Sequence, residues 1–222
     1  MPKATFFNLP DEKRAAICRV AVEEFASHPY NKASINRIVK RAGIAKGSFY
    51  QYFESKKDLY LYILQQAGET KLAYLAPVMR NQEGHDFFRL LRELYAAGIR
   101  FAREHPLYAE IGRRLLEAKG TPIYREVMGT NVPIATGFFE TLLEQAIARG
   151  ELRQDLDVKM VAYLIAAMNA LVVEYYTEYI AEDYGEHMLA TVEQFVDMLQ
   201  NGIAVLPERQ AAPTETLSVS TS

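Results

Sequence analysis

The chain has 222 residues and a formal net charge of -3, with 50% hydrophobic and 24% charged residues. This length and composition suit one or two globular domains that bury a substantial core, and they exclude a minimal peptide. Its one cysteine, Cys18, excludes an intrachain disulfide and fits a reducing compartment.

The sequence shows no sign of a membrane or targeting segment. Its start, MPKATFFNLPDEKRAA, lacks the charged-then-apolar order of a signal peptide. The longest apolar stretch, residues 160–173, covers 14 residues, whereas a bilayer span needs about 20. We therefore expect a soluble, cytoplasmic protein with no membrane partner.

Charge is distributed unevenly along the chain. Residues 1–60 carry eleven basic and six acidic residues, whereas the remainder carries 14 basic and 22 acidic residues. From His28 to Lys57 there are seven basic residues and one acidic residue, Glu54. Such a patch on an otherwise acidic protein indicates binding to a polyanion, with a solvated charged face as the alternative.

Hydrophobic periodicity predicts an all-α fold, because apolar residues recur at helical spacing and no sustained period-2 run stands out. The polar segment 207–222 has no periodicity and predicts a disordered tail. The expected helices cover residues 10–27, 35–42, 46–54, 55–79, 85–104, 107–118, 121–129, 133–149, 157–182 and 185–204.

Several residues mark the ends of the early helices. Ser34 is an N-cap residue type, and Gly43 can take a left-handed conformation after the second helix. Ser55 can cap the fourth helix, with Asp58 three residues on in a capping-box relation. Pro77 is expected to disturb this helix near its end.

The second and third expected helices are short and joined by a turn that contains glycine, which is the helix-turn-helix arrangement. Phe49 and Phe53 lie four residues apart and are expected to face the core. Gly47 and Gln51 then point most directly outward, with Tyr50 and Ser48 on the flanks. This third helix would present a glycine and an aromatic ring to solvent, unlike an ordinary surface helix.

Two lysines, Lys46 and Lys56, fall in the first turns of expected helices. A cation at this position opposes the helix dipole in the free protein. The same position becomes favourable once a phosphate or an electronegative base edge arrives. The arrangement therefore indicates a helix end that is suited to a bound state.

The stretch Ala33–Leu59, ASINRIVKRAGIAKGSFYQYFESKKDL, resembles the amino-terminal domain of TetR-family transcriptional regulators. The family pattern is Thr or Ser, then Ile-Ala near Lys-x-Ala-Gly-Val, then Ser-x-Gly-Thr-Leu-Tyr-x-Tyr-Phe and Ser-Lys-Glu-x-Leu. Ala45 stands where the family usually has Ser or Thr, which leaves open what caps the third helix. The matched residues are Ser34, Ile38, Arg41, Ala42, Gly43, Ile44, Gly47, Ser48, Phe49, Tyr50, Tyr52, Phe53, Ser55, Lys56 and Leu59.

The resemblance implies a helix-turn-helix domain over residues 1–55 whose third helix enters the major groove of a DNA operator. Lys46 and Gln51 would contact base edges. Tyr50, Tyr52 and Lys56 would contact phosphates, with packing on the first helix as the alternative for Tyr52. The implied DNA-binding residues are Ser34, Asn36, Lys46, Gly47, Ser48, Tyr50, Gln51, Tyr52 and Lys56.

The resemblance further implies that residues 56–206 bind a small-molecule effector and pair with a second copy, with a helix over about 55–79 as the connection. The last two helices are apolar around much of their circumference, which favours a homodimer through a four-helix bundle. The apolar, aromatic composition favours a hydrophobic or aromatic effector. Candidate effector-binding residues are Phe87, Leu91, Tyr95, Tyr108, Tyr124, Met128, Phe138, Met168, Asn169 and Tyr175.

The sequence contains no Gly-rich phosphate loop, nucleophile elbow, His-Glu-x-x-His or paired metal-ligand motif. We therefore expect no catalytic residues, no metal and no cofactor. The leading hypothesis is a ligand-responsive repressor that a small effector releases from a palindromic operator. A helical module that binds an acidic protein, and a protein that sequesters small molecules, are the alternatives.

Overall fold

The computed structural model describes residues 1–81, 84–180 and 186–204, and within these ranges the chain is helical without a strand ladder. This confirms the predicted all-α fold. The helices are α1 (Ala4–Phe7), α2 (Asp11–Ser27), α3 (Ile35–Arg41), α4 (Lys46–Tyr52), α5 (Lys56–Arg80), α6 (Phe87–Glu104), α7 (Pro106–Glu117), α8 (Pro122–Ala148), α9 (Val158–Tyr179) and α10 (Glu186–Ile203).

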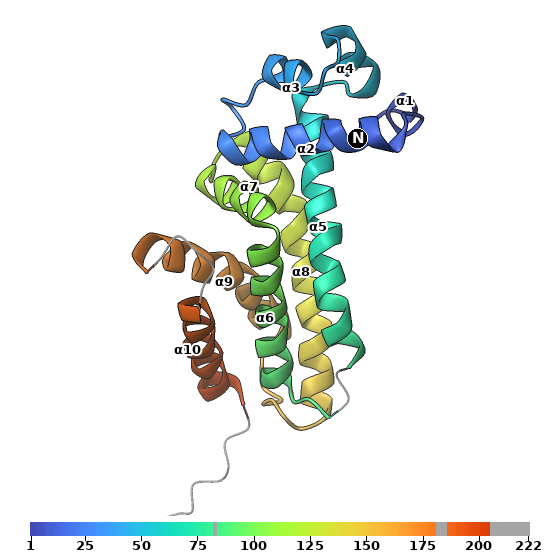
Figure 1. Ribbon diagram of the computed structural model, residues 1–222. Coiled ribbons are helices and arrows are strands. Elements are labelled where there is room, and N and C mark those ends of the chain that lie inside the picture. The colour runs from blue at the N-terminus through green and yellow to red at the C-terminus, as the bar shows by residue number, and fades with distance from the viewer. Residues whose placement is uncertain (82–83, 181–185, 205–222) are drawn as a thin grey trace, which may run out of the picture.

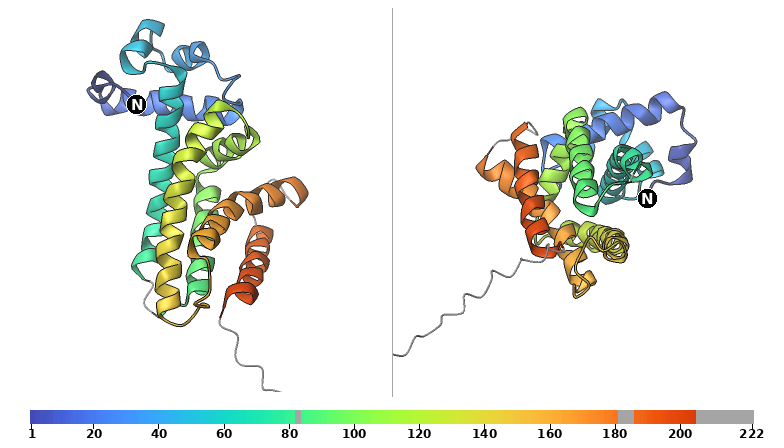
Figure 2. Two further views of the ribbon diagram at one scale, coloured as in Figure 1. Left: turned by 180° about the vertical axis from the view of Figure 1, so that it is seen from behind. Right: turned by 90° about the horizontal axis from the view of Figure 1, so that it is seen from below.

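The helices are arranged as a small amino-terminal group on a longer bundle. Figure 1 shows α1 to α4 together at one end, with α5, α6 and α8 running away from them side by side. Helices α9 and α10 flank this bundle, as the reverse view confirms (Figure 2). The predicted tail at 207–222 lies outside the described residues.

The sequence signals at the ends of the short helices act as predicted. The Ser34 hydroxyl accepts a hydrogen bond from the Arg37 amide at 3.4 Å, and Gly43 has a φ of 65° after α3. The Ser55 hydroxyl accepts from the Asp58 amide at 3.3 Å. These local contacts set the bounds of α3 and the start of α5, which confirms the expected helices over 35–42 and 55–79.

The predicted break between residues 129 and 133 is wrong, because α8 continues through Pro133 as one helix. An internal proline removes one backbone hydrogen bond and costs about 3 kcal/mol. Among the described residues, the most extensive helix-to-helix contact joins α8 to α9, and we attribute the continuity of α8 to this packing. Helix α5 likewise continues past Pro77 to Arg80.

Helix α1 was absent from the predicted elements. It places Phe6 in the amino-terminal core with none of its surface exposed. The Phe6 ring lies 4.9 Å from the ring of Phe53 and 5.5 Å from that of Tyr62, measured between centroids. Four residues are too few to show helical periodicity, so tertiary contacts create this helix.

Buried residues form two apolar cores. The first lies beneath α2, α3 and α4 and also includes Ile111 of α7 and Val127 of α8. The second joins the far parts of α5 and α8 to α6, α9 and α10. The predicted domain boundary at 55/56 stays a prediction, and the packing ties α7 and the start of α8 to the amino-terminal helices.

Helix α9 carries a large exposed apolar face. By length and composition alone it is apolar enough to cross a membrane, yet only 19% of its most apolar window is buried within the chain. The helix predicted over 157–182 is observed as α9. Leu164, Leu171 and Tyr175 are 45%, 49% and 54% exposed, so one face of α9 is open to a partner.

Candidate DNA-binding surface and effector cavity

Helix α4 is held by its aromatic residues and presents polar ones. Phe49 and Phe53 are fully buried, with ring centroids 5.4 Å apart. Gly47 and Gln51 are exposed on the opposite side of the helix, and Lys46 is exposed in its first turn. The structure therefore exposes both residues predicted to contact base edges, Lys46 and Gln51, together with Gly47.

The remaining predicted contacts surround this face. Tyr50 on α4 and Asn36 on α3 are exposed, whereas Ser48 and Ser34 are half-buried. Ser34 already caps α3 through its hydroxyl. Ala45, at the start of α4, makes no side-chain hydrogen bond to the helix, so a side chain at this position does not cap it.

The amino-terminal segment caps the carboxyl end of α4. The last carbonyls of a helix have no partner within it. Here the Lys3 amide donates to the Tyr52 carbonyl at 2.8 Å, and the Lys3 ammonium donates to the Tyr50 carbonyl at 3.1 Å. The Thr5 hydroxyl donates to the Gln51 carbonyl. This support for the exposed helix was not predicted.

Tyr52 is buried, with 7% of its surface exposed, and its ring lies 6.3 Å from that of Phe6. The ring therefore packs in the amino-terminal core, which was the alternative raised for this residue. The prediction named the helix over 10–27, which is α2, whereas the observed neighbour Phe6 belongs to α1. A phosphate contact by its hydroxyl stays a prediction.

Lys56 faces the protein. Its ammonium donates hydrogen bonds to the carbonyls of Tyr30 at 2.6 Å and Ala33 at 2.8 Å, and it lies 4.7 Å from the centroid of the Tyr30 ring. Partial burial lowers the pKa of this ammonium. These contacts fix the loop between α2 and α3, so the structure supports a positioning role for Lys56.

A buried carboxylate, Glu24, organises the start of α3. It is 2% exposed and accepts hydrogen bonds from the Arg37 guanidinium, the shortest at 2.6 Å, and from the Ser34 amide at 2.8 Å. Burial acts to raise the pKa of Glu24, but the hydrogen bonds from Arg37 and Ser34 outweigh it, so the net pKa is lowered.

This pairing reduces the positive charge of the surface. Arg37 is bound to Glu24, and Arg41 forms an ion pair with Glu23. Among the described residues, Lys40 and Lys46 have no ion-pair partner. The basic patch is therefore carried by fewer free cations than the sequence suggests.

A cavity of about 430 Å³ lies between α5, α6 and α7 and reaches α8, α9 and α10. Its volume is within the range of ligand sites, about 300–1,000 Å³. Two of the predicted effector-binding residues, Tyr95 and Tyr108, line it. The structure therefore places a ligand-sized space in the domain where the sequence predicted one.

The other predicted effector residues lie elsewhere. Phe87 and Leu91 are 1% and 2% exposed in the second core, where packing explains them fully. Met168 packs against the same core from α9. The side chain of Asn169 lies outside the described residues.

The last four predicted effector residues are outside the cavity lining. Tyr124 and Met128 are half-buried on α8, and Tyr124 packs against the first core. Phe138 and Tyr175 are exposed, at 36% and 54% of their surface. Aromatic composition alone could not separate residues that face the cavity from residues that face other helices or solvent.

Lys71 lines the cavity and was not predicted. It lies on α5 against α6, where a Cβ built on Gly98 would be 3.9 Å from the Lys71 Cε atom. The sequence signal was present, because Lys71 interrupts an apolar stripe on α5 that includes Leu64, Ala67 and Leu75. In the structure Lys71 is exposed at this lining.

Helix α7 joins the cavity to the DNA-binding end. Gly112 and Leu116 line the cavity, whereas Ile111 is fully buried in the first core. The Arg114 guanidinium donates to the Ala26 carbonyl, near the end of α2, at 2.6 Å. Helices α5 and α7 therefore each contribute residues to the cavity lining and to the first core.

The described residues contain no group of three or more His, Cys, Asp and Glu side chains arranged to hold a metal ion. The half-buried Cys18 is also poorly placed for chemistry, because burial raises the pKa of its thiol to about 11. A thiol with this pKa is protonated near neutral pH and is a weak nucleophile.

The short α3 and α4, with the exposed polar face of α4, define a helix-turn-helix DNA-binding protein. A sequence model described as "Bacterial regulatory proteins, tetR family" matches residues 17–63. A TetR family transcriptional regulator of solved structure, from Chloroflexus aurantiacus J-10-FL, is 35% identical with a TM-score of 0.68, covering 93% of this chain and 100% of that chain.

Curated relatives also match in sequence. The HTH-type transcriptional activator FasR of Mycolicibacterium smegmatis is 41% identical over 71 residues, which are 32% of each protein. The probable acrEF/envCD operon repressor of Escherichia coli K12 is 25% identical over 155 residues, 67% of this chain and 69% of that protein. The chain belongs to the TetR family, whose members are DNA-binding transcriptional regulators and not enzymes.

Proposed function

We propose that this regulator is a repressor that leaves a palindromic operator when a small hydrophobic or aromatic effector enters the 430 Å³ cavity. One observation carries the proposal, namely that α5 belongs to both sites. Its first turns place Leu59 and Ile63 in the amino-terminal core. Two turns later, Lys71 and Leu75 line the cavity.

On the DNA side, the exposed face of α4 enters the major groove. Gln51 can bind adenine through two hydrogen bonds, and Lys46 can donate to guanine. Contacts to phosphates set the register without selecting a sequence. Tyr52 and Lys56 would hold this surface in place from within the protein. The residues proposed to contact DNA are Ser34, Asn36, Lys46, Gly47, Ser48, Tyr50 and Gln51.

A homodimer through α9 and α10 completes the proposal. The exposed apolar face of α9 supports it, since a second copy would cover this face and form a four-helix bundle. A two-fold axis would place two copies of α4 about one DNA turn apart, or somewhat more, on a palindromic site. The domain division at residues 55 and 56 then separates DNA contact from effector binding and dimerisation.

Effector binding would act through α5 and α7. A ligand shifts the equilibrium only by its difference in affinity between DNA-competent and DNA-incompetent conformations. Movement of α7 would pull on α2 through the hydrogen bond from Arg114 to the Ala26 carbonyl. The two recognition helices of a dimer would then lose the spacing that the operator requires.

Selection of bound sequences from random duplex DNA tests this proposal. A recurring palindrome is the expected result, and a lack of enrichment would favour a module that binds an acidic protein. Among the curated relatives, one is named as an activator and another as a probable repressor. A reporter gene controlled by the selected site therefore tests the sign, with lower expression expected when the protein is present.

A further inference from the structure

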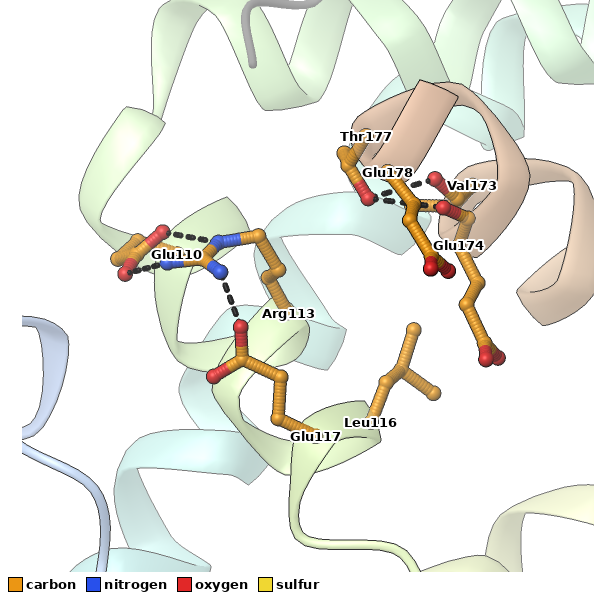
Figure 3. A pocket seen from close by; sticks show the side chains of 8 residues that line it. All are labelled: Glu110, Arg113, Leu116, Glu117, Val173, Glu174, Thr177 and Glu178. Atoms are coloured by element: carbon orange, nitrogen blue, oxygen red, sulfur yellow. Dashed lines mark hydrogen bonds and ion pairs between the residues drawn. The ribbon is translucent and has the colours of Figure 1, made fainter. Parts of the chain in front are cut away.

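A hollow between α7 and α9 gathers charged side chains, yet it needs no ligand. It has a volume of about 420 Å³, and its charged lining consists of Glu110, Arg113, Glu117, Glu174 and Glu178 (Figure 3). The Arg113 guanidinium pairs with Glu110 at 2.6 Å and also with Glu117. Glu174 and Glu178 are exposed, so water solvates their charge. The hollow therefore indicates no further site, unlike the contacts at the end of α4.

Helix α4 ends without a complete local cap. Helix α3 is followed by Gly43 in a left-handed conformation, and the amides on either side of Gly43 donate to carbonyls of α3. By contrast, α4 is followed by Phe53 with an extended backbone, and the Phe53 amide donates to the Phe49 carbonyl. The carbonyls of residues 50, 51 and 52 receive no backbone hydrogen bond from the described residues that follow α4.

Residues 3 and 5 supply the missing donors. The Lys3 amide donates to the Tyr52 carbonyl at 2.8 Å, and the Lys3 ammonium donates to the Tyr50 carbonyl at 3.1 Å. The Thr5 hydroxyl donates to the Gln51 carbonyl, 46 residues away in the chain. Each of the last three carbonyls of α4 therefore has a donor, and the charge of Lys3 suits the negative end of the helix dipole.

Phe6 holds these donors against α4. Its ring is fully buried and lies 4.9 Å from the ring of Phe53 and 6.3 Å from that of Tyr52, measured between centroids. Helix α4 has seven residues, and isolated helices shorter than about 12–15 residues are marginal in water. The last turn of α4 therefore depends on contacts from outside the helix.

We propose that Lys3 and Thr5 are positioning residues for sequence recognition, because they hold the last turn of α4 and with it Gln51. This inference rests on the proposed function, in which Gln51 contacts a base. Gln51 lies in the last turn, and its own carbonyl accepts the hydrogen bond from Thr5. Lys46 lies in the first turn, which these bonds do not reach.

The chemistry of base recognition makes the position of Gln51 sensitive to this support. Glutamine binds adenine through two hydrogen bonds, whose donor and acceptor must both be aligned. Hydrogen bonds weaken steeply as they bend. A lysine ammonium, in contrast, is a point charge on a flexible stem and tolerates small displacements. Loosening of the last turn should therefore weaken recognition by Gln51 before it weakens attraction to phosphates.

Affinities for the selected palindrome and for palindromes changed at one base pair in each half-site test this inference. Gln51→Ala first identifies the base pair that Gln51 contacts. Thr5→Val should reduce discrimination at that base pair by about two- to tenfold, the factor that one neutral hydrogen bond provides. Discrimination at the other base pairs should stay unchanged. Thr5→Ser keeps the hydroxyl and should retain the native ratio.

Lys3→Met is a second, independent variant, since it removes the donor to the neighbouring Tyr50 carbonyl. It should lower the same ratio, whatever its effect on overall affinity. Thr141→Val is the matched control, because Thr141 is exposed on α8 and its hydroxyl donates to the Gly137 carbonyl within that helix. It should leave every ratio unchanged.

Two results would overturn the positioning role. One is an unchanged ratio at the Gln51 base pair in both Thr5→Val and Lys3→Met. The other is an equal fall at every base pair, which would indicate general loosening of the DNA-binding end. Thermal unfolding of each variant shows whether it is folded at the temperature of the assay.

Gln51→Ala separates this inference from the proposed function. If it changed discrimination at no base pair, the proposed base contact would fail and the positioning role with it. If it removed discrimination while Thr5→Val and Lys3→Met did not, recognition by Gln51 would stand and the positioning role alone would be refuted.

Discussion

Lys46 and Lys56 occupy the same position in the first turns of α4 and α5, yet they have different surroundings. Lys46 is exposed and has no partner among the described residues. Lys56 uses its ammonium to bind the carbonyls of Tyr30 and Ala33. Their contributions to DNA binding should therefore differ in kind.

The salt dependence of operator binding distinguishes the two lysines. Lys46→Ala should reduce the slope of log affinity against log salt by about 0.9. The reason is that the variant loses one cation that releases counterions from the DNA phosphates on binding. Lys56→Ala should weaken binding through the loosened loop between α2 and α3 and leave the slope unchanged. Fluorescence anisotropy at several salt concentrations measures both, and an equal loss of slope in Lys56→Ala would instead identify a phosphate contact.

Glu24 should make the stability of the DNA-binding end depend on pH. Its folded pKa is lowered, so its contribution is complete above the unfolded pKa, about 4.3, and is lost as the pH falls through the folded value. Glu24→Gln should lower the free energy of unfolding by about 1–3 kcal/mol at pH 7. Urea unfolding should show this difference shrinking below about pH 4, and a difference that persists there would contradict the assignment.

At the scale of elements, the amino-terminal segment supports α4 by packing and by capping. Phe6 and Phe7 provide a matched pair, because Phe6 is fully buried and Phe7 is 50% exposed. Phe6→Ala should destabilise the protein by about 3–5 kcal/mol, and Phe7→Ala by about 1 kcal/mol or less. Thermal unfolding measures both, and similar losses would refute the packing role of α1.

Local signals made the helices of the DNA-binding end predictable. Ser34, Gly43 and Ser55 act on amides or turns within a few residues of themselves, so their effect is visible in the sequence. The continuity of α8 through Pro133 was not predictable, because it depends on packing against a helix more than twenty residues away.

The same reasoning explains which site residues were found. Gly47 and Gln51 were correctly expected to be exposed on α4, because helical geometry alone fixes their direction relative to Phe49 and Phe53. The partners of Glu24 and Lys56 come from other elements, and periodicity does not contain this information. Lys71 did leave a trace, as a charge within an apolar stripe.

At the scale of the whole molecule, the exposed face of α9 predicts the oligomeric state. The native chain should sediment at about twice its mass of 25.2 kDa. Leu171→Glu should shift it toward monomer, since a carboxylate would be buried in the interface. Leu72→Glu is the control, because Leu72 is 63% exposed on α5. Dissociation by both changes, or by neither, would contradict an interface at α9.

Sequence-specific DNA binding by α4 can be tested with one ratio of affinities. Affinity should be measured at physiological salt for the selected palindrome and for a duplex of the same composition in shuffled order. A specific regulator should prefer the palindrome by about 10³-fold or more, and Gln51→Ala should reduce that ratio. Equal affinity for the two duplexes would contradict sequence-specific binding by α4.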